Sequence, residues 1–324
     1  MSLRGSFGFA LLALWAVGSP AVARADCAQL GGQFDAAIAS RSAPAIIAAN
    51  KAVEDSDVCD LDAHAFLRRA LNGVIEALAN APGAAAPQDT VDWLFAKLGL
   101  SGDWRSAERL GKYFDSRGDR RSAQLAYELA AGLTGRNIGA AATLDDLKRL
   151  SNEAFAAKSL ASFDAERQTE KPYPKSTRAA GGEITIYALA MRTVGIGKMP
   201  APVNFIYDST AMTESGKAAA GELAEVAMQQ RLSRFRLIGH ADPRGDAAYN
   251  LKLSLGRAEV LKRAVQEAIA AAKDNYLGAH PMPEIEVAGK GAAEPFDLSY
   301  LPYKPSLDET YQLDRRVEFE FRDP

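Results

Sequence analysis

Asp242 and Arg257 are the two residues whose types and spacing best fit the binding of a charged ligand. Asp242 precedes a Pro-Arg-Gly turn, and Arg257 comes fifteen residues later, in the first turns of an expected helix. A carboxylate at a sheet edge accepts hydrogen bonds from an ammonium group, and a guanidinium binds a carboxylate through two parallel hydrogen bonds. The pair therefore predicts a site for a zwitterionic group. A salt bridge that only closes the turn is the alternative.

Two neighbouring residues have alternative interpretations. Asn250 lies between the charged pair and can offer polar support to a peptide, but an Asn before a helix is also a common N-cap. His240 next to Asp242 suggests a metal site, yet the other histidines, His64 and His280, have no matching ligand spacing. We therefore expect no metal, no cofactor and no catalytic residue.

The segment around the charged pair alternates between strand and helix patterns. We expect strands over residues 184–191, 203–207, 235–239, 284–288 and 316–321. We expect helices over residues 215–230 and 253–272. This order predicts an α+β domain, with Asp242 at the edge of its sheet.

The motif residues of this segment resemble those of a known family. The run Gly239-His240-Ala241-Asp242-Pro243-Arg244-Gly245 is followed by Tyr249-Asn250, Leu253-Ser254 and Arg257-Ala258, and later by Gly289, Gly291, Glu294-Pro295 and Asp314–Glu318. Over about residues 202–322 the chain resembles the peptidoglycan-binding domain of the OmpA C-terminal family, closest to its peptidoglycan-associated lipoprotein branch. The resemblance implies that Asp242 and Arg257 bind diaminopimelate of the stem peptide, with Asn250 in support.

The half of the chain before this domain is rich in alanine and has the period of helices. Within it, Ala107, Leu110, Gly111 and Phe114 share one face of a first helix, Gly118-Asp119 makes a turn, and Ala123, Tyr127 and Ala130 face back from a second helix. This spacing resembles a tetratricopeptide or Sel1-like repeat, although helical hairpins of any kind have similar spacing. The fold class is thus an all-α helical-hairpin N-terminal domain plus an α+β OmpA-like C-terminal domain.

The N-terminus has the pattern of an export signal, with a basic start, an apolar stretch and small residues at Ala23-Arg24-Ala25. We expect a mature chain from Asp26 in the periplasm, at the cell wall and the outer membrane. Cys27 and Cys59 then favour a disulfide, because exported cysteines pair. The alternatives are two unpaired thiols and a lipoprotein signal, which Asp26 before Cys27 disfavours.

These patterns divide the chain into four segments. We expect a signal peptide over residues 1–25, a helical tetratricopeptide or Sel1-like domain over 26–163, a polar linker with two prolines over 164–182, and the OmpA-like domain over 183–324.

Composition limits the function further. Lys and Arg number 38 against 41 Asp and Glu, so the chain lacks the basic excess of nucleic-acid-binding proteins. We expect a non-enzymatic cell-envelope protein that binds peptidoglycan and presents its helical domain to an envelope protein partner. The alternatives are a cell-wall enzyme with a targeting domain and a stator-like envelope protein.

Overall fold

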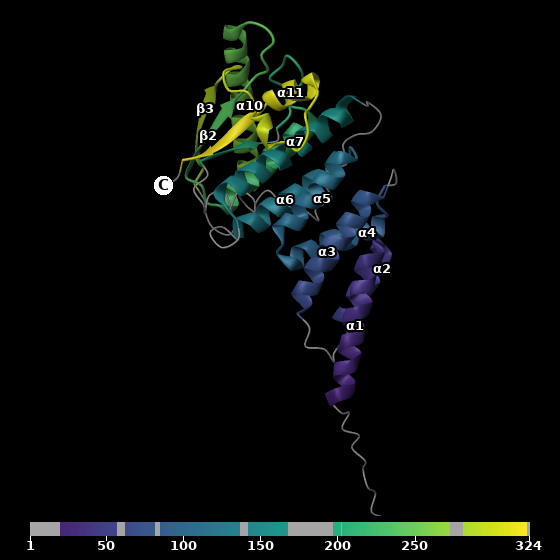
Figure 1. Cartoon of the computed structure of the whole chain (residues 1–324). Coiled ribbons are helices and arrows are strands. Elements are labelled where there is room, and N and C mark those ends of the chain that lie inside the picture. Colours follow the sequence, from purple (N-terminus) through teal and green to yellow (C-terminus); the bar gives the residue numbers. More distant parts are fainter. Residues whose placement is uncertain are drawn as a thin grey trace, which may run out of the picture. The chain divides into compact units, whose positions relative to one another are not determined.

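The computed structural model describes residues 20–56, 62–81, 85–136, 142–167, 197–201, 203–272 and 281–322 (Figure 1). Contacts within the chain divide it into two compact units, the first ending at Ala77 and the second beginning at Leu78. Among the helices that the structure describes, none combines the length and the apolar character needed to cross a bilayer.

The first unit is helical. It contains α1 (Pro20–Ser40), α2 (Ala43–Glu54) and most of α3 (Ala63–Asn80), and it fully buries Phe34, Ile46 and Leu71. Cys27 lies in α1, and no cysteine in the described part of the chain is a free thiol. Cys59 lies outside the described residues, as do residues 1–19 of the expected export signal, so both the disulfide and the export signal stay predictions.

The second unit begins with the end of α3 and with α4 (Gln88–Ser101). A layer of three helices, α5 to α7, follows. α5 (Trp104–Ser116) and α6 (Arg120–Arg136) form the predicted hairpin, with Gly118 at φ +74° in its turn. A methyl group at Gly111 would lie 2.6 Å from the ring of Tyr127, so glycine allows the helices to approach closely. The apolar residues predicted for this contact are buried, namely Ala107, Leu110, Phe114, Ala123, Tyr127 and Ala130. The hairpin is therefore confirmed, whereas its assignment to a repeat family stays a prediction.

The last helix of this layer, α7 (Leu144–Arg167), is buried on nearly all sides along its middle. From Glu153 to Leu160 every residue except the half-buried Lys158 is buried. The helix continues past residue 163, so residues 164–167 of the expected linker are helical, and residues 168–182 lie outside the described part. The predicted domain limits therefore stay a prediction.

The C-terminal part is an α+β fold, as predicted. Its strands are β1 (Lys198–Ala201), β2 (Arg234–Gly239), β3 (Glu284–Gly289) and β4 (Val317–Phe321), in the sheet order β1-β4-β2-β3. β2 pairs with β3 in parallel and with β4 in antiparallel register, while β1 pairs antiparallel with β4. The helices are α9 (Glu214–Gln229), α10 (Ala247–Ala272) and α11 (Leu307–Asp314), with a 3-10 turn, η3 (Leu298–Tyr300). α10 packs on β2, β3 and α9.

The strand expected over residues 203–207 is wrong, because β1 lies over Lys198–Ala201 instead. The backbone of the later segment serves the start of α9. The carbonyl of Asn204 accepts the N–H of Thr213, which caps α9, and a methyl group at Gly216 would lie 2.2 Å from that carbonyl. Phe205 makes only an isolated bridge, to Met212. The strand expected over residues 184–191 lies outside the described residues.

α7 also packs on the α+β fold. Phe155 and Leu160 of α7 share a buried apolar cluster with Phe296 and Leu313. Around it, Lys158 pairs with Glu222 at 2.7 Å, and the Ser159 hydroxyl lies 3.3 Å from Asn204 Oδ1. The α+β fold therefore completes part of its core with a helix that precedes the expected linker.

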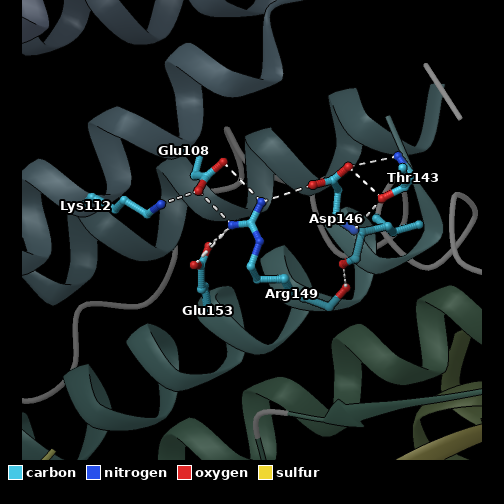
Figure 2. Close-up of polar contacts among 8 residues, drawn as sticks. Glu108, Lys112, Thr143, Asp146, Arg149 and Glu153 are labelled. Carbon is cyan, nitrogen blue, oxygen red and sulfur yellow. Dashed lines mark hydrogen bonds and ion pairs between the residues drawn. The ribbon is translucent and has the colours of Figure 1, made fainter. Parts of the chain in front are cut away.

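A partly buried charge network joins α5 and α7 (Figure 2). Arg149 of α7 donates to Glu108 at 2.7 Å, to Asp146 at 3.4 Å and to Glu153 at 3.3 Å, and Lys112 pairs with Glu108. Three carboxylates thus share two cations. Glu153 is 2% exposed, and its burial raises its pKa to about 7, with Arg149 opposing and Glu108 reinforcing the shift.

We expect the stability of this layer to fall with rising pH. The folded-state pKa of Glu153 is raised above its ordinary value of 4.5, so its stabilising contribution is full below about pH 4.5 and is lost as the pH rises through about 7. The loss amounts to about 1–3 kcal/mol. Glu153→Gln should remove most of this loss in thermal unfolding and in hydrogen exchange of α7 amides.

Asp145→Asn is the matched control for Glu153→Gln, because Asp145 lies on the same helix with its side chain 92% exposed. It should leave the pH dependence unchanged. An identical pH profile in wild type and Glu153→Gln would contradict the assignment.

The packing of α7 predicts that replacing one of its buried residues destabilises the α+β fold. Leu160→Ala removes fully buried atoms beside Phe296 and Leu313, and such substitutions cost about 2–5 kcal/mol. Amides of α11 and β4 should exchange faster by a corresponding factor, while Leu100→Ala, at a 66% exposed position, should leave them unchanged. Unchanged exchange in Leu160→Ala would show that the α+β fold does not depend on α7.

Candidate functional site

The parallel pairing of β2 and β3 places the loops that follow these strands at one edge of the sheet. Two backbone bonds join these loops: Ala241 N–H donates to Gly291 O at 2.8 Å, and Lys290 N–H donates to Gly239 O at 2.9 Å. Asp242 follows β2, which lies inside the sheet between β4 and β3. Its position is therefore fixed by the sheet and by the neighbouring loop.

α10 places Arg257 next to this edge. The helix begins at Ala247, six residues earlier than expected, because Asp246 caps it by accepting the N–H groups of Ala248 and Tyr249. Arg257 consequently lies three turns into α10, not in its first turns. A methyl group at Gly239 would lie 1.9 Å from the carbonyl of Ser254, so the close approach of β2 and α10 requires glycine.

The carboxylate of Asp242 is buried and held by two arginines. Oδ1 accepts the Arg244 N–H at 3.1 Å and Nε–H at 2.9 Å, while Oδ2 accepts from Arg244 Nη2 at 2.8 Å and Arg315 Nη1 at 2.9 Å. Burial opposes ionisation, but these hydrogen bonds outweigh it and lower the pKa of Asp242 to about 2. The turn-closing partner of Asp242 is therefore Arg244 and not Arg257.

Arg257 is fully buried, and its guanidinium is only partly used. Nε donates to the Ser209 carbonyl at 3.0 Å, and the guanidinium carbon lies 5.3 Å from the centre of the Phe205 ring. Within the part of the chain that the structure describes, Nη1 and Nη2 have no hydrogen-bond partner. Loss of solvation, reinforced by repulsion from Arg315, lowers the pKa of Arg257 to about 10.

Both predicted residues line one cavity of about 120 Å³. Its charged lining residues are Asp208, Asp242, Arg244, Arg257 and Arg315, so positive groups outnumber negative ones by one. Tyr207 and Tyr249 form part of its exposed rim, at 62% and 46% exposure. A cavity with a surplus cation whose donors are unused suits a ligand that carries a carboxylate.

Asn250, the third predicted residue, also lines the cavity, but it lies inside α10 and does not cap it. Its amide group donates to the carbonyls of Asp242 at 3.1 Å and Arg244 at 2.8 Å. The side chain therefore holds the loop that presents the Asp242 carboxylate. Peptide contact by Asn250 stays a prediction.

Arg244 and Arg315 were not among the predicted site residues. Arg315 belongs to the Asp314–Glu318 match and follows α11, 73 residues beyond Asp242. Its place in that motif match is the signal that the sequence offers, but the sequence does not show which cations reach Asp242. Arg244 lies two residues from Asp242, at a distance at which a turn allows pairing.

His240 belongs to a different cluster from the one considered in the sequence. It is fully buried, and its Nε2 lies 3.3 Å from Glu318 rather than beside Asp242. Glu294 completes a group with metal-ligand atoms within 4.8 Å of one another. Glu318 already pairs with Lys198 at 2.9 Å and with Arg316 at 2.8 Å. Both carboxylates of this group are therefore already paired with cationic side chains, Glu318 with Lys198 and Arg316 and Glu294 with Lys290.

Comparison with known proteins found one matching family and several similar solved structures. Residues 204–302 match the OmpA family, which confirms the predicted OmpA-like domain. The peptidoglycan-associated lipoprotein from Burkholderia pseudomallei is 21% identical, with a TM-score of 0.28, over 39% of this chain and 90% of that one. The OmpA-like domain of FopA1 from Francisella tularensis subsp. tularensis SCHU S4 is 19% identical, with a TM-score of 0.27, over 38% and 69%. None of the curated proteins matches this sequence.

The close contact between β2 and α10 can be tested by replacing Gly239 with alanine, which adds one methyl group. Gly239→Ala should destabilise the α+β fold by about 1–3 kcal/mol or more, because its new atom would overlap the Ser254 carbonyl. Gly221→Ala in α9 is the control, since nothing lies within 4 Å of its added atom, and it should be neutral or slightly stabilising. Denaturant unfolding measures both, and equal stability of the two variants would refute the constraint.

Proposed function

We propose that this protein binds peptidoglycan non-covalently through the diaminopimelate of the stem peptide. The observation that carries the proposal is the buried guanidinium of Arg257, whose Nη1 and Nη2 lack hydrogen-bond partners among the described residues, in a side chain that lines the cavity. The match of residues 204–302 to the OmpA family supports it. The free end of diaminopimelate carries a carboxylate and an ammonium, which fit a cavity containing both signs of charge.

In this proposal the ligand carboxylate binds Arg257. A pKa of about 10 keeps the guanidinium charged at neutral pH, so it presents two N–H donors to an incoming anion. Burial has already removed its water, and a carboxylate would restore the lost hydrogen bonds. Hydrogen bonds of this kind are strong where solvent is excluded.

The ligand ammonium binds Asp242 in the same proposal. Asp242 stays ionised because its pKa is about 2, and the buried Arg315 holds one of its oxygens from the inner side. Asn250 acts as a positioning residue, since its amide holds the carbonyls of Asp242 and Arg244. Two charged contacts at a fixed separation select for a zwitterionic end.

We propose binding without catalysis. Of the two carboxylates that line the cavity, Asp242 is held by Arg244 and Arg315 and has a pKa of about 2, which makes it a weak general base. The proposed location is the periplasm, where the wall lies within reach. The helical layer is proposed to present a surface to an envelope protein.

The proposal predicts that residues 26–324 co-sediment with diaminopimelate-type sacculi. Asp242→Ala and Arg257→Ala should each abolish most of this binding, because losing one partner of a buried charged contact costs about 2–5 kcal/mol. Arg257→Lys should also bind less well, since a lysine keeps the charge but lacks the planar fork. The full segment is used because α7 completes the core of the α+β fold.

The controls for this experiment separate site, fold and chemistry. Arg234→Gln makes the same charge change as losing Arg257, at an exposed position in the same domain, and should sediment like wild type. Sacculi in which lysine replaces diaminopimelate lack the second carboxylate and should be held weakly. Release of soluble muropeptides would favour a cell-wall enzyme. Wild-type sedimentation by folded Asp242→Ala and Arg257→Ala proteins would refute the site.

A further inference from the structure

Arg244 covers the outer side of Asp242. Its backbone N–H, Nε and Nη2 supply three of the four hydrogen bonds that the carboxylate accepts, and Arg315 supplies the fourth. A carboxylate offers about four lone-pair sites. Asp242 therefore has no acceptor site left for an incoming ammonium group.

The two arginines differ in their freedom to leave. The side chain of Arg315 is 9% exposed and also donates to Gln312 at 2.7 Å, so it is fixed from two sides. The side chain of Arg244 is 40% exposed and lies over two aromatic rings, 5.0 Å from the centre of Tyr207 and 4.5 Å from that of Tyr311. A ligand can displace Arg244 without breaking the buried contacts of Arg315.

We infer that Arg244 is an internal occupant of Asp242, which leaves the carboxylate when the ammonium of a ligand enters. This inference rests on the proposed function and adds a competition within the site. The backbone N–H of Arg244 remains on Oδ1, so the loop keeps its shape while the side chain moves. Arg244 thereby lowers the affinity for ligands with an ammonium, whereas ligands with carboxylates alone have no need to displace it.

The test is an NMR titration of residues 26–324 with two small molecules. meso-Diaminopimelate carries both ammonium and carboxylate groups, and pimelate is the same seven-carbon diacid without the ammonium groups. In the wild-type protein, diaminopimelate should shift the Arg244 Nε–H signal and speed its exchange with water. Pimelate, bound at Arg257, should leave that signal in place.

Arg244→Met removes the side-chain donors and keeps an unbranched apolar stem over the tyrosines. It should lower the Kd for diaminopimelate by about three- to fivefold, the upper part of the range for a partly exposed ion pair, and leave the Kd for pimelate within about twofold. Arg244→Lys keeps the charge without the bidentate fork and should give an intermediate Kd. Arg234→Met, at an exposed ion pair with Glu286, should change neither Kd.

The outcomes distinguish this inference from the proposed function. Weaker diaminopimelate binding by Arg244→Met, or an Arg244 Nε–H signal that diaminopimelate leaves unchanged, overturns the competition while the site stands. Equal changes for both ligands also overturn it, because they indicate a general effect of charge. If Asp242→Ala and Arg257→Ala bind diaminopimelate like wild type, or if wild type does not bind it, both proposals fall.

Discussion

The saturation of the Asp242 carboxylate is the interaction on which the rest of the site depends. A buried carboxylate is stable only when it is paired, and Asp242 meets this need with the turn at Arg244 and with Arg315 ahead of β4. These contacts join the end of β2 to a segment 73 residues further along the chain. With Asp242 satisfied from these two sides, Arg257 keeps its buried charge without a bidentate partner. The cavity therefore contains one cationic side chain more than it has carboxylates.

Two buried carboxyl groups in the second unit show how partner number sets ionisation. Asp242 accepts from two guanidinium groups and has a lowered pKa. Glu153 accepts from one, that of Arg149, which also donates to Glu108 and Asp146, and its pKa is raised. Burial raises both pKa values, but hydrogen bonds from Arg244 and Arg315 outweigh it at Asp242, whereas repulsion from Glu108 adds to it at Glu153. The α+β fold therefore keeps a permanent charge at its site, while the helical layer contains a group that changes charge near neutral pH.

The sequence predicted the features that depend on local spacing and left open those that depend on distant segments. The α5–α6 hairpin and three of the strands follow from hydrophobic period and turn residues. The motif predicted that Asp242 and Arg257 lie close together, and both line one cavity. The pairing of Asp242 with Arg315 was not predictable, because local sequence patterns do not show which distant arginine or lysine lies next to Asp242 in the fold. The segment 203–207 is apolar enough for a strand, but the carbonyl of Asn204 accepts a hydrogen bond from Thr213, the N-cap of α9, and not from a neighbouring strand.

The double packing of α7 has a consequence for moving the site into another protein. A graft cut at the change in composition after residue 163 would leave the helix behind and turn Phe296 and Leu313 toward water. The excised piece would then carry a new apolar patch, which favours self-association. A fragment that keeps α7 would instead expose the face of α7 that packs on α6. The apolar residues of that face would then have to be replaced by polar ones. The fragment should therefore begin before α7, because residues of this helix belong to the core of the α+β fold.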